Sequence, residues 1–258
     1  MIYNEIHSEL LEIMKAIDSI CAREELVYML NAGTLLGAVR EKGFIEWDRD
    51  ADLMMHRKDY DAFEKCSEKH LRPMGLCLSY ADRVPRVHRA DNPKRHVEIL
   101  IIDALPQNAL KRRCKVIMLK LLQGMTKQDI NYQKYSFKGR MMVYAASLLG
   151  NLFREETKRK YYKQLSVLGN DENSEWVFFS NERYRFMNLK IDRNILAESM
   201  KIPFEYTELS VPKEWDKFLR IYYGDNYMIP KRENYYIIMT LLNMMYCFDY
   251  MGIMTAGL

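Results

Sequence analysis

The stretch NAGTLLGAVREKGFIEWDRDADLMM, residues 31–55, decides how this chain folds. A small-residue turn over 31–34 leads into the apolar run 35–40, which predicts a short helix ended by Gly43. Residues 48–55 then alternate acids with other residues and pass into an apolar run. This pattern predicts a strand with an acidic edge directly after the helix.

Two acids two residues apart mark the start of that strand. Asp50 and Asp52 project to the same face of an extended strand, so their carboxylates lie side by side. A divalent cation is the simplest explanation for such a pair, and Mg²⁺, with Mn²⁺ as a substitute, suits carboxylate sites that also take phosphates. Asp48 lies two residues before Asp50 and would project to the same face if the strand included it. The alternative interpretation is an acidic turn that solvates a strand end.

Three further residues or pairs point to phosphate chemistry near these acids. The backbone N–H groups of Gly33 and Thr34 begin the short helix and can cradle a phosphate, which the helix dipole favours. Arg40 ends that helix and is expected near the same acids, where it can bind phosphate oxygens. Asp103 ends another apolar run and completes a metal site if its strand neighbours the first. Its alternative role is that of a strand-terminal turn residue.

The remaining pattern predicts a small α/β unit followed by helices. Residues 5–22 and 57–71 have helical apolar spacing, and 76–80 and 96–103 have strand composition. The spacing is helical again over 108–168. We therefore expect a catalytic core over 1–106, a basic helical insertion over 107–168, and a C-terminal region over 169–258 packed on the core. The apolar run 235–248 is too short to span a bilayer and predicts a buried helix.

Charge and cysteine content restrict the possible settings. Five widely spaced cysteines without a C-x-x-C pair indicate neither a disulfide framework nor a zinc site, and so favour a reducing, cytoplasmic compartment. Residues 107–165 hold nine lysines, five arginines and three acids, a net charge of +11 in a chain of +4. This asymmetry indicates an anionic partner such as a membrane surface, a phosphate-rich polymer or nucleic acid. A solvated basic helical face is the alternative.

Several motifs together resemble the signature of the LicD family, bacterial phosphorylcholine transferases related to fukutin-type enzymes. They are the run Ala32 to Arg40, Lys42-Gly43-Phe44-Ile45, Trp47-Asp48 with Asp50 and Asp52, Tyr60 and Phe63, Ile102-Asp103 with Pro106, Val211-Pro212 with Trp215, and Tyr222-Tyr223-Gly224-Asp225 with Tyr227, Met228 and Pro230. Arg49 departs from the family, because many members have another aspartate there. This departure leaves the identity of the donor open.

The resemblance implies an α+β fold: a nucleotidyltransferase-like small mixed sheet flanked by helices, with a helical middle and C-terminal region. It implies that Asp50, Asp52 and Asp103 are the catalytic and metal-binding acids, and that Gly33-Thr34 lies against the donor phosphates. The implied reaction moves a phospho-alcohol, such as phosphocholine, from a CDP-linked donor to a hydroxyl of a cell-surface glycan or teichoic-acid precursor, releasing CMP. Asp103 is also the expected general base.

Two alternative functions remain open at this level. The same acids suit a nucleotidyltransferase that attacks the α-phosphate of a nucleoside triphosphate. A non-catalytic protein that uses its basic helices for binding is the second alternative, which the three clustered acids disfavour. We expect a cytoplasmic protein with an optional peripheral contact at the inner face of an anionic membrane. Nucleic acid is a less favoured partner, since no recognition helix is evident.

Overall fold

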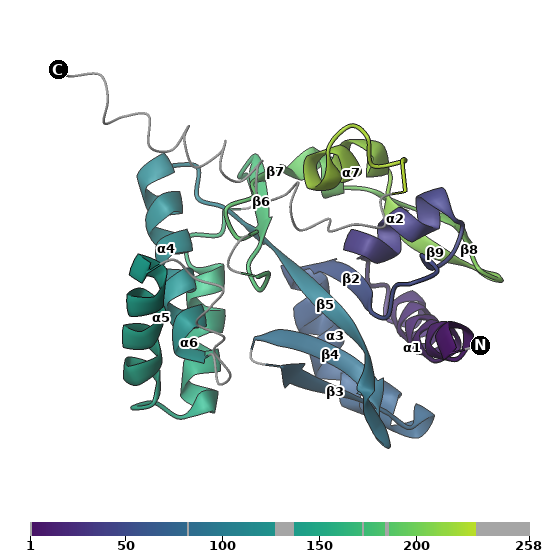
Figure 1. The fold of residues 1–258 in the computed structure, drawn as a ribbon, viewed down its shortest axis with the longest axis horizontal. Coiled ribbons are helices and arrows are strands. Elements are labelled where there is room, and N and C mark those ends of the chain that lie inside the picture. Colours follow the sequence, from purple (N-terminus) through teal and green to yellow (C-terminus); the bar gives the residue numbers. More distant parts are fainter. Residues whose placement is uncertain (1, 82, 127–136, 172, 184–185, 231–258) are drawn as a thin grey trace.

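A mixed sheet forms the centre of the structure, a computed structural model that describes residues 2–81, 83–126, 137–171, 173–183 and 186–230. Its strands follow the order β1-β2-β5-β4-β3, and β6 and β7 extend it from one end of β5 (Figure 1). Strands β2 and β5 are parallel, and the other neighbours are antiparallel. The strands are β1 (Tyr28–Leu30), β2 (Ala51–His56), β3 (Leu76–Ala81), β4 (Val84–Arg89), β5 (Asn92–Ala104), β6 (Trp176–Phe179) and β7 (Ile191–Asp192).

Helices cover both faces of this sheet. Helix α1 (Ile2–Arg23) buries one apolar stripe against β4 and β5, and α3 (Arg57–Leu71) contacts β2, β3 and β5. Helix α2 (Ala32–Arg40) packs on β2 and also contacts α7 (Trp215–Tyr223). A hairpin of β8 (Ser199–Phe204) and β9 (Thr207–Pro212) lies beside β1. Two short 3-10 helices complete these regions: η1 (Arg72–Met74) and η3 (Arg193–Leu196).

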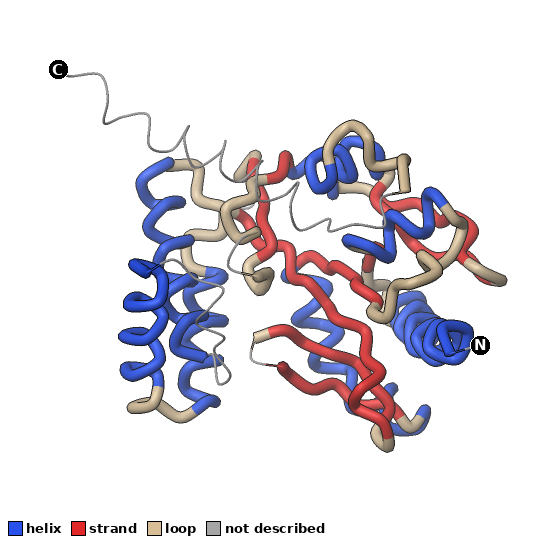
Figure 2. Tube along the Cα trace, viewed as in Figure 1, coloured by secondary structure: helices blue, strands red, loops and turns tan. Residues whose placement is uncertain are grey.

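Three helices between β5 and β6 form a separate unit at one side of the sheet, clearest in Figure 2. They are α4 (Ala109–Thr126), α5 (Phe137–Gly150) and α6 (Glu155–Val167). A second, smaller apolar core joins this unit to the sheet, with Leu119 of α4, Leu165 of α6 and Phe178 of β6 among its members. None of the described helices is long and apolar enough to cross a membrane.

The expected mixed α+β class is confirmed, and most elements lie where the sequence placed them. Helices α1 and α3, the helical pattern in the described parts of 108–168 and strand β3 agree with the predictions, and residues 127–136 lie outside the described residues. Strand β5 begins earlier than expected, at Asn92, and the hairpin strand β4 was not predicted. The first acidic strand begins only at Ala51, so Asp48 and Asp50 lie in the loop before it. The apolar run 235–248 lies outside the described residues.

Candidate functional site

The start of β2 and the start of α2 lie against each other. The Asp52 N–H donates to Thr34 Oγ1 at 2.9 Å, and the Asn31 N–H donates to the Asp52 backbone oxygen at 2.9 Å. A Cβ at Gly33 would lie 2.6 Å from Asp48 Oδ2, so a larger residue there would displace the Asp48 side chain. The structure therefore brings Gly33 and Thr34 together with the first acids, as the sequence predicts.

Two acids at this point, Asp48 and Asp52, hold protons more tightly than isolated carboxylates. Burial, followed by a hydrogen bond and charge repulsion from Asp50, raises the pKa of Asp48 to about 7. The pKa of Asp52 is also raised, first by burial and then by the charges of Asp50, Glu98, Glu182 and Asp48. We call these five residues the acidic cluster. Their mutual repulsion is the electrostatic condition that a bound cation relieves.

Glu98 and Glu182 are members of the acidic cluster that the sequence patterns did not reveal. The parallel register pairs Asp52 with Glu98, so both side chains lie on one face of the sheet. Burial alone would raise the pKa of Glu98, but its hydrogen bond with His96 and the Arg86 guanidinium lower it to about 2. Arg86 Nε lies 2.9 Å from Glu98 Oε1. Glu98 therefore stays ionised beside Asp52.

Glu182 follows β6 and is buried. Burial raises the pKa of its carboxyl, although the Arg183 N–H and the Tyr222 hydroxyl both donate hydrogen bonds to it. The Tyr222–Glu182 distance is 3.1 Å. Because Glu182 is 84 residues or more from the other acids in sequence, no local spacing could have connected it with them.

The N-terminus of α2 has two unusual features. Asn31, which precedes the helix, is fully buried, and among the described residues neither its side-chain oxygen nor its nitrogen has a hydrogen-bond partner. Ala32 has a φ of 45°, a left-handed conformation that costs a non-glycine residue about 1 kcal/mol or more. Buried polar groups are normally satisfied, so the Asn31 amide is a group that an ordered water or a ligand atom would satisfy.

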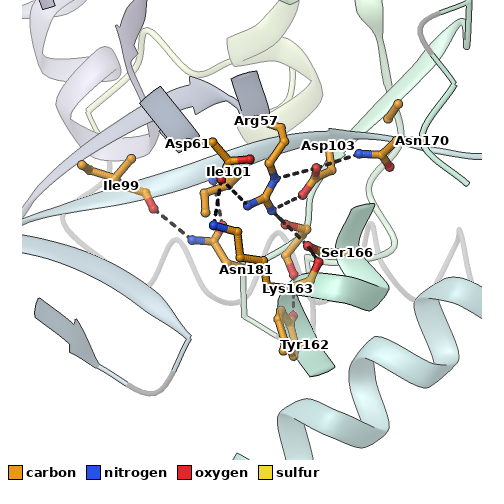
Figure 3. A network of polar contacts seen from close by, with 12 residues as sticks. Arg57, Asp61, Ile99, Ile101, Asp103, Tyr162, Lys163, Ser166, Asn170 and Asn181 are labelled. Carbon is orange, nitrogen blue, oxygen red and sulfur yellow. Dashed lines mark hydrogen bonds and ion pairs between the residues drawn. The ribbon is translucent and has the colours of Figure 1, made fainter. Parts of the chain in front are cut away.

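The structure does not bring Asp103 to the acidic cluster. Asp103 follows Glu98 by five residues on β5, which places it on the opposite face of the sheet and about 16 Å further along the strand. Its carboxylate is 1% exposed and accepts hydrogen bonds from Arg57 Nε at 3.0 Å and from a terminal guanidinium nitrogen at 2.6 Å (Figure 3). The geometry is that of a buried bidentate ion pair.

This ion pair belongs to a network that joins the sheet to the three-helix unit. Asn170, just after α6, donates to Asp103 Oδ1 at 2.9 Å, and the same Arg57 nitrogen donates to Ser166 Oγ at 3.0 Å. Figure 3 shows these side chains converging on Asp103 from β5, α3 and α6. Lys115 of α4 lies nearby, and burial lowers its pKa to about 8. Asp103 thus serves as the anchor of the helical unit in this geometry.

Arg40 lies at the C-terminal end of α2, six residues and about 9 Å of helix from Thr34. Its Nε donates to Glu41 Oε1 at 2.7 Å. The structure therefore separates Arg40 from the end of the helix that meets the acids. Arg49 lies inside the acidic loop, where its backbone N–H donates to Asp48 Oδ1 at 3.0 Å.

A second group of metal-ligand side chains, Glu24, Cys66 and His70, has an ordinary explanation. Arg23 lies 3.4 Å from His70 Nδ1 and can only donate, so this nitrogen is the acceptor. The other ring nitrogen then carries the proton and donates to Glu24 Oε1 at 2.6 Å. The contact ties the end of α1 to α3 and leaves no ring nitrogen lone pair for a metal.

Carboxylates at the start of a central strand, facing the N-terminus of a short helix, are an arrangement typical of domains that handle phosphates. Residues 25–141 match the family described as LicD/FKTN/FKRP, nucleotidyltransferase domain. This part of the chain belongs to that family.

Two relatives are similar over parts of the chain. The lipopolysaccharide cholinephosphotransferase LicD of Haemophilus influenzae is 47% identical over 53 residues, 20% of this chain and 20% of that protein. The uncharacterized protein RP689 of Rickettsia prowazekii is 27% identical over 108 residues, 38% of this chain and 41% of that protein. The chain thus matches between a fifth and about two fifths of the length of these relatives.

Proposed function

We propose that the chain is a LicD-type phosphotransferase, which moves a phospho-alcohol from a CDP-linked donor to a hydroxyl of a cell-surface glycan or teichoic-acid precursor. The observation that carries this proposal is the acidic cluster, which faces the N-terminus of α2. The 47% identity to a cholinephosphotransferase makes phosphocholine the first group to test. Nucleotidyl transfer at an α-phosphate remains the competing reaction, since it would use the same acids.

The proposed cofactor is Mg²⁺, or Mn²⁺ in its place. Asp50 and Asp52 would hold it, and Asp48 and Glu98 extend the set of oxygen ligands that hard cations prefer. The raised pKa of Asp52 supports this assignment, because it comes from burial and from repulsion by neighbouring acids, and a bound cation relieves that repulsion. When bound, the cation supplies charge neutralisation to the phosphates of the donor.

In the proposed reaction the acceptor oxygen attacks the β-phosphorus of the CDP-alcohol. The bond from that phosphorus to the bridging oxygen breaks, CMP leaves, and the hydroxyl proton is released. The N–H groups of Gly33 and Thr34 bind phosphate oxygens at the N-terminus of α2. The Asn31 amide gains from the donor the hydrogen-bond partner that it lacks among the described residues. We assign Asp103 to the support of the fold, because its carboxylate is occupied by Arg57.

Product analysis tests the proposal. The full chain is incubated with Mg²⁺, a glycan acceptor extract and CDP-choline, CDP-ribitol or CDP-glycerol, and CMP is measured. CMP release by wild type with one donor, and a loss of at least about a hundredfold in Asp50→Asn and Asp52→Asn, is expected. Asp91→Asn is the matched control, because Asp91 is exposed and pairs with Arg89. Pyrophosphate release from a nucleoside triphosphate, without CMP from any donor, would establish nucleotidyl transfer instead.

A further inference from the structure

Exposed apolar side chains gather on the three-helix unit. Thirteen of the twenty large apolar residues that are exposed in the described part of the chain lie between 110 and 168. This unit holds fewer than a third of the described residues, so the concentration is far above an even distribution. Such a concentration of exposed apolar side chains is typical of a binding surface.

Exposed apolar side chains on α5 form a stripe on the side of the helix opposite α4. Met141, Tyr144 and Leu148 follow helical spacing and are 61%, 55% and 51% exposed. Leu152, in the turn directly after α5, extends this stripe and is 77% exposed. The opposite side of the helix faces α4, where Gly124 leaves room for Ala146. Figure 1 shows α5 at the outer edge of the molecule. The stripe therefore lies on the outside of the described part of the chain.

Helix α4 adds a second exposed stripe to the same unit. Leu110, Ile117 and Leu121 recur at intervals of seven and four residues and are 71%, 48% and 44% exposed. Its buried side, which includes Val116 and Leu119, packs into the smaller core. Both helices therefore keep one apolar face inward and leave another outward.

The described segments that carry these stripes are cationic. Residues 107–126 and 137–154 contain four lysines, four arginines and no acid. Lys111, Arg113 and Arg154 are exposed. An exposed apolar stripe with basic residues beside it is the pattern of a helix that lies in the interface of an anionic bilayer. Two copies of this surface would repel each other, and nucleic acid would not require the apolar stripe.

We propose that the three-helix unit binds the surface of an anionic lipid bilayer, with the outer stripe of α5 inserted among the lipid headgroups. The basic residues contribute the electrostatic part, each worth roughly a fivefold change in partitioning near the surface. The apolar stripe contributes the part that salt does not screen. This inference rests on the surface alone and does not depend on the proposed function.

Vesicle flotation of the full chain tests it. Vesicles of phosphatidylcholine alone are compared with vesicles that also contain phosphatidylglycerol, at low and high salt. We expect binding to the mixed vesicles at least tenfold above binding to phosphatidylcholine, weakened by salt. The double variant Leu148→Glu with Leu152→Glu should lose at least tenfold in binding. The matched control, Met74→Glu with Met200→Glu, changes two exposed apolar residues outside the unit and should bind as wild type does.

Several results would overturn the proposal. They are the absence of binding to both vesicle types, equal binding to both without a salt effect, and undiminished binding by the Leu148 and Leu152 variant. An equal loss in the control pair would also reject a specific role for α5. A change of oligomeric state in the α5 variant, measured by light scattering without lipid, would identify a second copy as the occupant. Circular dichroism verifies that each variant is folded.

Discussion

Asp103→Asn should destabilise the fold while leaving the metal site intact. The substitution keeps the shape of the side chain but removes the negative charge that Arg57 contacts at 3.0 and 2.6 Å. Removing one partner of a buried ion pair costs about 3–5 kcal/mol. Asp61 lies 3.6 Å from the same guanidinium and retains part of the interaction, so we expect the lower end, about 3 kcal/mol. For a chain of this size the melting temperature should fall by about 6–12 °C.

Urea denaturation at pH 7 measures this loss, and titration calorimetry with Mn²⁺ measures metal affinity on the same samples. Asp91→Asn is the control, because the Arg89–Asp91 pair is also bidentate but about half exposed, and such pairs contribute about 0–1 kcal/mol. The double variant Arg57→Met with Asp103→Leu should recover part of the stability, since no charge is left buried. Wild-type stability of Asp103→Asn combined with loss of Mn²⁺ binding would refute the reasoning and return Asp103 to the metal site.

Three further predictions concern the acidic cluster. Gly33→Ala should lower CMP release at least about tenfold without unfolding the chain, because its Cβ would displace Asp48; unchanged kcat would argue against the close approach. The pKa of Asp48 is about 7 in the folded chain, above the value of an unfolded aspartate, which is about 4. The protonated Asp48 side chain therefore contributes fully to the stability of the metal-free chain below about pH 4, and this contribution is lost as pH rises through 7. Urea titrations at several pH values should show this loss in wild type and not in Asp48→Asn. The pKa of Glu98 is lowered to about 2, so the ionised Glu98 side chain stabilises the folded chain at pH values above the usual glutamate pKa, and this stabilisation is lost as pH falls toward 2. Glu98→Gln should abolish this acid sensitivity and weaken Mn²⁺ binding. An unchanged Mn²⁺ affinity would exclude Glu98 as a ligand.

Local sequence patterns predicted the positions of helices and strands better than they predicted how neighbouring strands align in the sheet. Helices α1 and α3 have one buried stripe each, so apolar spacing alone was sufficient to place them. Strand β4 was missed because Pro85, Arg86 and Arg89 interrupt the strand composition of a six-residue segment, although β4 pairs with both β3 and β5. Asp50 and Asp52 could be identified because their spacing is local.

The membership of the acidic cluster depends on information that the sequence does not carry locally. Asp103 and Glu98 belong to the same apolar run, and only the register of β5 against β2 decides which of them lies opposite Asp52. Glu182 arrives from beyond the helical unit. Asp103 matches the family motif, and this match led to its prediction as a metal ligand. The contact of the Arg57 side chain with the Asp103 carboxylate could be found only in the three-dimensional structure.

Arg57 follows β2 directly, and the 46 residues that separate it from Asp103 are the same offset that pairs Asp52 with Glu98. The Arg57–Asp103 contact therefore helps to fix the register of the parallel strands β2 and β5. A slip of one residue would break that contact and would also turn a valine or an isoleucine toward Asp52 in place of Glu98. The register that places Glu98 beside Asp52 on one face of the sheet is therefore the same register that a contact on the opposite face supports.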